Sequence, residues 1–331
     1  MKKISLTFSF LFLFLFTSAF VGAAFAGGGI THMYIAQKAM RAIPDNHLRN
    51  LLLDNIDAYL AGAYYPDSGY VKGASYGEDS HWDPFIYTFA DYLKEEYPDP
   101  SIQNPKLVAF LLGCAAHRVS DEIIHWTFYR ASAKEDFKGD WEGAHQNGDV
   151  GIDAFLNIDQ DQWLSNPTTW WVPVKDLLQV YHRMGKDQYK AEEIIWGNSA
   201  IFVAGFGERF VSPPLYLYYK WEMPWTYAHY TDWPAGGILA DTQKVVEYQM
   251  NLWSRLQNGS TPLLTVTHPK NTTDNINSAS LHFAENALAS KAVTVSVQKQ
   301  SDGSVVLEEP VISKINQFRT LLNQWITAIT K

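Results

Sequence analysis

The stretch Leu107-Val-Ala-Phe-Leu-Leu-Gly-Cys-Ala-Ala-His117-Arg-Val-Ser-Asp121-Glu-Ile-Ile-His125-Trp126 decides how this chain folds. Its apolar residues predict a buried helix, yet His117, Asp121 and His125 recur in it at intervals of four residues. Each four-residue step along an α-helix rotates by about 40°, so the three polar side chains share an arc of about 80°. A buried carboxylate needs a positive partner, and the two histidines beside it favour a metal ion. The alternative is a pair of core histidines satisfied by hydrogen bonds.

The start of the chain predicts export. Within residues 1–26, Lys2 and Lys3 precede an apolar run, and Ala24-Phe25-Ala26 fits a signal-peptide cleavage site. We therefore expect a secreted or periplasmic protein whose mature chain begins at Gly27. No later stretch is apolar enough to cross a bilayer, so no transmembrane span is expected in the mature chain.

Composition restricts how this exported chain is stabilised and what it binds. Cys114 is the single cysteine, which excludes an intrachain disulfide and suggests a small core residue. The 331 residues can bury a large core, and bound metal could add stability. The formal net charge of −9 argues against electrostatic capture of nucleic acid or an anionic membrane. That argument is weak, because divalent cations would reverse the sign inside a cleft.

Helical patterns dominate the sequence after the signal peptide, which predicts an all-α fold. The exception is a β-hairpin predicted for residues 292–298 and 304–308, around Ser301-Asp302-Gly303. A stretch rich in Asn, Thr and Pro at 257–275 marks the expected boundary between a main domain, 27–258, and a C-terminal helical extension with the hairpin, 259–331. The sequence indicates no function for that extension.

Eight His and Asp side chains within 118 positions are candidate metal ligands: His32, Asp67, His81, His117, Asp121, His125, His145 and Asp149. A set of oxygen and nitrogen ligands without thiolates is typical of an open catalytic zinc site. Each candidate also has a simpler interpretation. Asp67 fits a Pro-Asp-Ser-Gly turn, and Asn147-Gly148 predicts a turn that would keep His145 and Asp149 off a common helix face. Asp83 is assigned to N-capping.

Five motifs occur in a recognisable order: Gly-Ile-Thr-His32, Pro-Asp67, His81-Trp-Asp-Pro-Phe, the helix motif ending in His125-Trp, and Ala-His145-x2-Gly-Asp149. In this combination the chain resembles the zinc-dependent phospholipase C superfamily, and most nearly the catalytic domain of the glycosylphosphatidylinositol-specific phospholipases D. The spacing of His125 follows the phospholipase D type, whereas bacterial phospholipases C and single-strand-specific zinc nucleases space this histidine more widely. The resemblance runs from Gly27 to about Phe155 and implies a helical, phospholipase-like catalytic domain over 27–258.

The resemblance also implies three zinc ions in a cleft. Carried over by position, the first zinc would be held by Asp67, His81, His117 and Asp121, and the second by His125, His145 and Asp149. The third would be held by His32, by Asp121 as a bridging carboxylate, and by the amino group and carbonyl of Gly27. Cleavage after Ala26 would then complete the site. Members of this family often begin with Trp or Cys, so Gly27 departs from the pattern.

The implied activity is phosphodiester hydrolysis, in which a hydroxide shared by two zinc ions attacks phosphorus in line. Asp67 and Asp121 are the candidate catalytic residues, and whether Asp67 is a ligand or a general base stays open. The aromatic segment from Tyr216 to Trp233 could contact a lipid interface, line a headgroup pocket or stack on nucleobases, although helix packing is expected for most of it. We expect phospholipids as substrates. The alternatives are an exported single-strand-specific zinc nuclease or nucleotidase, and a non-catalytic zinc-stabilised binding protein.

Overall fold

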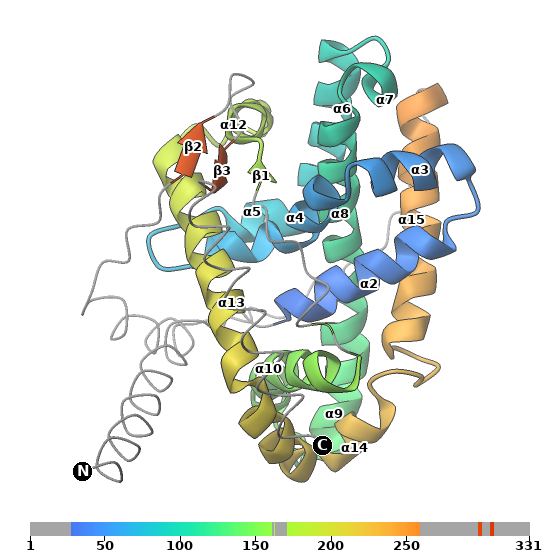
Figure 1. The fold of residues 1–331 in the computed structure, drawn as a ribbon, viewed down its shortest axis with the longest axis vertical. Helices are drawn as coiled ribbons and strands as arrows, with labels where there is room; N and C mark the ends of the chain where they lie inside the picture. The colour runs from blue at the N-terminus through green and yellow to red at the C-terminus, as the bar shows by residue number, and fades with distance from the viewer. Residues whose placement is uncertain (1–27, 161, 163–170, 259–296, 300–304, 308–331) are drawn as a thin grey trace, which may run out of the picture.

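The structure is a computed structural model that describes residues 28–160, 162, 171–258, 297–299 and 305–307 (Figure 1). Most of this part of the chain is helical. The helices, with one 3-10 segment (η1) and one π segment (η2), are α2 (Gly29–Ala42), α3 (Asn46–Asp54), α4 (Ile56–Tyr64), η1 (Pro66–Tyr70), α5 (Gly77–His81), α6 (Asp83–Glu96), α7 (Pro100–Gln103), α8 (Pro105–Ile123), η2 (Ile124–Phe128), α9 (Tyr129–Glu135), α10 (Trp141–Asp159), α12 (Val174–Arg183), α13 (Ala191–Glu222), α14 (Pro224–His229) and α15 (Ile238–Asn258). The strands are β1 (Trp171–Val172), β2 (Val297–Lys299) and β3 (Val305–Leu307).

Helix α8 is the centre of the fold. It packs against α4, α15, α2 and α6, and Figure 1 shows it crossing the molecule between them. The helix begins with Pro105 behind the N-cap Asn104, whose side chain accepts a hydrogen bond from the Leu107 amide at 3.2 Å. Every residue from Leu107 to Asp121 is buried. The predicted buried helix is therefore confirmed, and its polar residues lie inside the protein.

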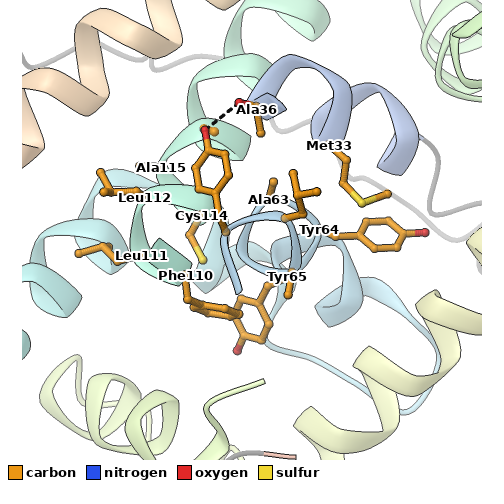
Figure 2. Packing of buried hydrophobic residues seen from close by; sticks show 14 of the residues in the cluster. Met33, Ala36, Ala63, Tyr64, Tyr65, Phe110, Leu111, Leu112, Cys114 and Ala115 are labelled. Carbon is orange, nitrogen blue, oxygen red and sulfur yellow. Dashed lines mark hydrogen bonds between the residues drawn. The ribbon is translucent and has the colours of Figure 1, made fainter. Parts of the chain in front are cut away.

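Two glycines bring the backbones of α4 and α8 into direct contact. A Cβ atom on Gly113 would lie 2.0 Å from the Tyr59 carbonyl oxygen, and one on Gly62 would lie 2.1 Å from the Phe110 carbonyl oxygen. Figure 2 shows Phe110 and its neighbours on α8 packed against the end of α4. The fully buried Cys114 lies in the same cluster, as the sequence predicted. The close contact places the Ala63 carbonyl beside α8, where it becomes important for the site.

Replacing Gly113 by Ala is expected to lower the free energy of unfolding by about 2 kcal/mol, because the added methyl group overpacks a backbone contact that cannot relax. Urea denaturation followed by circular dichroism measures the change. An unchanged denaturation midpoint would contradict the α4–α8 contact.

The α-helical geometry of α8 ends before His125, so the expectation of one α-helix through Trp126 was wrong in its last turn. Residues Ile124–Phe128 form a π-helical turn that leads into α9. A π turn closes over five residues instead of four, and such turns occur frequently at functional sites. The arc of about 80° inferred for a regular helix therefore does not apply to His125, although its Nε2 still lies 3.4 Å from Asp121 Oδ1.

The predicted N-cap role of Asp83 was also wrong. Asp83 is the first residue of α6, and no side chain caps that helix. Its carboxylate instead accepts hydrogen bonds from Arg118 Nε at 2.6 Å and from the Tyr248 hydroxyl at 2.7 Å. Asp83 therefore links α6, α8 and α15 through a partly buried ion pair.

The antiparallel pairing predicted for the C-terminal hairpin is confirmed between β2 and β3. The turn around Ser301-Asp302-Gly303 lies outside the described residues. Strand β3 also pairs antiparallel with β1, with Trp171 opposite Val306 and Val172 opposite Val305. The all-α fold thus carries one small sheet to which residues on both sides of the expected domain boundary contribute.

Other expectations fall on residues that the structure does not describe. The signal peptide at 1–26, Gly27 and most of the extension 259–331 lie outside the described residues. Among the helices that are described, none is both long and apolar enough to span a membrane.

Candidate metal centre

All eight predicted ligands lie close together where α2, η1, α5, α8, η2 and α10 meet. They form three groups, within each of which the ligand atoms lie no more than 4.8 Å apart. The first group is Asp67, His81 and His117, the second is His125, His145 and Asp149, and the third is His32, His117 and Asp121. Gly27, the ninth predicted ligand, precedes the described residues.

The two histidines of the first group are held in one tautomer by backbone carbonyls. Nδ1 of His81 donates to the Gly77 carbonyl at 2.6 Å, and Nδ1 of His117 donates to the Ala63 carbonyl at 2.9 Å. A carbonyl oxygen only accepts, so both protons of the neutral rings are on Nδ1 and both Nε2 atoms carry lone pairs. These Nε2 atoms lie only 3.1 Å apart. The backbone of α4 and α5 therefore sets the direction of the two lone pairs.

The two facing lone pairs require a positive charge between them, and the third candidate ligand of the group, the Asp67 carboxylate, is an anion. Asp67 Oδ1 lies 3.3 Å from His81 Nε2 and 3.6 Å from His117 Nε2, and the buried Oδ2 atom has no hydrogen-bond partner in the described part of the chain. Ligands bound to tetrahedral zinc at 2.0–2.1 Å lie about 3.3 Å from one another. The spacing and chemistry of this group therefore fit a zinc ion.

The pKa values of His81 and His117 without metal also indicate a positive charge between the two rings. Burial lowers the pKa of His81, but Asp67 and Asp121 raise it above its ordinary value. Burial, followed by His32, lowers the pKa of His117 to about 3. The pair thus favours a single positive charge between its nitrogens, which a proton supplies in the absence of metal.

Asp121 connects all three groups. Its Oδ1 lies 3.4 Å from Nε2 of both His32 and His125, and its Oδ2 lies 3.7 Å from His81 Nε2. Burial raises the pKa of Asp121, but the surrounding imidazoles, with His125 first, lower it well below its ordinary value. Asp121 is therefore an anion at the middle of the cluster, which is the position required of a bridging carboxylate.

The third group is oriented by Ser120, a residue that the sequence interpretation missed. The Ser120 hydroxyl donates to the His117 carbonyl at 3.3 Å and can accept from Nδ1 of His32 at 2.7 Å. His32 then presents a bare Nε2 to Asp121. This third group differs from the ligand set that the family resemblance implies, because it also includes His117.

The main chain before α2 passes directly beside these ligands. Gly28 has a φ of +87°, and a Cβ on it would lie 3.3 Å from His32 Nε2 and 3.6 Å from Asp149 Oδ1. Glycine suits this position because it adopts a left-handed conformation without strain and leaves the space open. The backbone at Gly28 therefore lies between the second and third groups.

Replacing Ser120 by Ala is expected to weaken zinc binding at the third group by about tenfold, since the partner that orients a ligating histidine is lost. Titration of the zinc-loaded protein with a chelator measures this affinity. Ser132→Ala is the matched control, because Ser132 is equally buried in a helix but bonds Thr226 instead of a predicted ligand. Equal effects of the two substitutions would contradict the assigned role.

The second group depends on an uninterrupted α10. The turn predicted at Asn147-Gly148 does not form, and that alternative was wrong: α10 is helical from Trp141 to Asp159. His145 and Asp149 therefore share a helix face, with His145 Nε2 3.5 Å from Asp149 Oδ2. Gly148 makes room for the ring of Tyr129, whose hydroxyl donates to Asp149 Oδ1 at 2.8 Å.

Exposure distinguishes the second group from the others. The side chains of His125 and His145 are 21% and 20% exposed, whereas those of His81 and His117 are 2% and 0% exposed. A substrate can therefore reach the cluster from the side of the second group.

Another buried acid near the centre, Asp241 on α15, was absent from the predicted set. Both of its carboxylate oxygens are buried without a hydrogen-bond partner among the described residues. Burial raises the pKa of Asp241 well above its ordinary value, with His32, Asp121 and His125 as its charged neighbours. No motif or spacing in the sequence pointed to this residue.

These features define a class of protein: an all-helical fold built around a candidate multinuclear centre of histidines and aspartates. A family model described as zinc dependent phospholipase C matches residues 31–194. Through this part, just under half of its length, the chain is similar to the zinc-dependent phospholipase C family.

Curated relatives carry the name phosphatidylinositol-glycan-specific phospholipase D. The protein from Dictyostelium discoideum is 31% identical over 224 residues, and the human protein is 32% identical over 226 residues. These alignments cover 64% and 63% of this chain but only 23% and 27% of the relatives, so the chain matches about a quarter of their length. No solved structure matches the chain.

Proposed function

We propose that this protein is a zinc-dependent phosphodiester hydrolase that acts on phospholipids, with cleavage of the phospholipase C or D type. The observation that carries the proposal is the cluster itself, in which the acceptor atoms of eight His and Asp side chains face one another around the Asp121 carboxylate. The family and the names of the relatives support phospholipid as the substrate class.

The proposed centre holds three zinc ions. The first would be bound by Asp67, His81, His117 and Asp121, the second by His125, His145 and Asp149, and the third by His32, Asp121 and the amino group and carbonyl of Gly27. Export with cleavage after Ala26 is part of this proposal, because only cleavage frees that amino group. The position of Gly28 beside His32 Nε2 supports it.

Zinc in such a centre, when bound, lowers the pKa of a bound water toward neutrality and withdraws charge from phosphoryl oxygens. The chain supplies the geometry and the proton acceptor. Asp121 holds the three groups together, and Asp67 has two separate functions available: its Oδ1 faces the histidine pair, while its buried Oδ2 has no hydrogen-bond partner among the described residues and is available as an acceptor. This arrangement supports Asp67 as both ligand and base.

The surface offers further support for a lipid substrate. Most aromatic side chains of the segment pack against the core, with Tyr219 and Tyr230 buried. Leu217, Tyr218 and Trp221, at the end of α13, are instead 69%, 48% and 76% exposed. Tyr and Trp favour membrane interfaces, so these three side chains support peripheral contact with lipid.

The test is product analysis on a mixed panel of phosphatidylcholine, phosphatidylinositol and glycosylated phosphatidylinositol. Zinc-loaded protein should release diacylglycerol if cleavage is of the C type, or phosphatidate if it is of the D type, and mass spectrometry distinguishes the two. A His81→Ala variant is the inactive control, since it removes a ligand of the first group.

Two outcomes would overturn the proposal. Turnover of single-stranded DNA without turnover of any phospholipid would favour the nuclease alternative. A protein that binds zinc and melts at a higher temperature with it, but hydrolyses nothing on a broad phosphodiester panel, would favour a binding protein.

A further inference from the structure

Asp153 binds the amino end of α2 from the neighbouring helix α10. Its Oδ2 accepts a hydrogen bond from the Ile30 amide at 3.1 Å, and its Oδ1 accepts from the amide and the hydroxyl of Thr31 at 2.7 and 2.5 Å. The first amides of a helix have no partner within the helix, and a carboxylate there is further stabilised by the helix dipole. Asp153 is completely buried, so its position is fixed by the packing around it.

We propose that Asp153 is a positioning residue of the metal centre: it fixes the start of α2 on α10 so that His32 and the Gly28 backbone lie beside the other ligands of the third group. The inference rests on the proposed zinc function, and it assigns a role to a residue that is in none of the three ligand groups.

The position of Asp153 on α10 supports this role. Asp153 follows His145 and Asp149 at intervals of four residues, so one face of α10 carries two ligands of the second group and the anchor for α2. Across the contact, His32 directly follows Thr31, and its amide donates to the Gly28 carbonyl at 2.8 Å. A shift of the first turn of α2 would therefore move the His32 ring and the backbone of Gly28 together.

The bonding pattern also explains why a carboxylate is required. Oδ1 of Asp153 accepts from Thr31 and Oδ2 from the Ile30 amide, with the buried Glu208 carboxyl also beside Asp153. An amide NH2 in place of Oδ2 would therefore put a donor against the Ile30 donor. The amide at position 153 would push the start of α2 away from α10 without changing the volume of the side chain.

The same protein contains a control with the same bonding pattern at a partly buried aspartate. Asp136 accepts hydrogen bonds from the Trp225 amide at 3.0 Å, from the Thr226 amide at 2.8 Å and from the Thr226 hydroxyl at 2.7 Å. It thus anchors the start of α14 as Asp153 anchors the start of α2, and α14 carries none of the predicted ligands.

The experiment compares Asp153→Asn with Asp136→Asn in the complete mature protein. Zinc per chain is measured by elemental mass spectrometry after equilibration with a weak chelator, and melting temperature is measured with and without zinc. Both variants should melt at a lower temperature when metal-free, but only Asp153→Asn should lose one of the three zinc ions, with about ten- to hundredfold weaker binding of that ion. The other two ions should be retained.

A milder variant covers the case in which Asp153→Asn fails to fold. Thr31→Val removes only the hydroxyl contact and should weaken the same single ion while the fold is kept. Asp153 or Thr31 variants with three zinc ions bound as tightly as in the wild type would overturn the role of Asp153. Wild-type protein that binds no zinc would overturn the proposed function itself, and the inference with it.

Discussion

Replacing Asp121 by Asn is expected to lower phosphodiester hydrolysis at least a thousandfold, about 4 kcal/mol in transition-state free energy, while the chain stays folded. Asp121 has oxygens near histidines of all three groups. An asparagine keeps the shape of the side chain but not its charge. Its NH2 group can neither accept a hydrogen bond nor bind a cation. The nitrogens of His32 and His125 would lose their anionic neighbour, so at least one zinc ion should be lost with the activity.

The matched control for this substitution is Asp83→Asn. Asp83 is an aspartate beside α8 that is partly buried, and its partners are Arg118 and Tyr248. Loss of the Asp83 charge should reduce stability, because less negative charge then balances the buried Arg118 guanidinium. The zinc content should stay unchanged. Elemental analysis and hydrolysis assays on both variants provide the comparison. An Asp121→Asn protein with full zinc and full activity would refute the bridging role.

The parts of the structure that the sequence predicted well are those where the signal is local. Helix α8 combines an apolar run with regularly spaced polar residues, so both its burial and its candidate ligands could be predicted from neighbouring positions. The π turn at His125 was not predictable in this way, since the same residue types favour an α-helix equally well. Likewise Gly148 resembles a turn residue in the sequence, but the structure uses it to make room for Tyr129.

The residues whose roles were missed or wrongly predicted are those that act through tertiary partners. Ser120 lies next to Asp121 in the sequence, yet only folding brings its hydroxyl to His32. Asp83 has the local features of an N-cap residue, but its carboxylate instead accepts a hydrogen bond from Arg118. A signal for Asp153 was present, because it continues the four-residue spacing of the ligands on α10, but its partners are more than 120 positions away.

The metal-free and zinc-loaded proteins should respond to pH in opposite directions. Burial lowers the pKa of His125, but Asp121 and Asp149 raise it more, to about 9 in the metal-free protein. A group whose pKa is higher in the folded state contributes stability that is complete below its unfolded value of about 6.5 and is lost as the pH rises through about 9. The raised pKa values of His32 and His81 act in the same direction.

Zinc reverses this trend, because it binds the deprotonated ligands and competes with protons for the same nitrogens. The zinc-loaded protein should therefore gain stability between pH 6.5 and 9 while the metal-free protein loses it, and at neutral pH removal of zinc should lower the melting temperature by more than about 10 °C. Thermal unfolding across this pH range, in buffers with zinc or with a strong chelator, measures both curves. In a metal-free His125→Gln variant the downward slope should be shallower, because the residue that titrates near pH 9 is gone. Parallel curves with and without zinc would show that the histidines and aspartates of this cluster do not bind the metal.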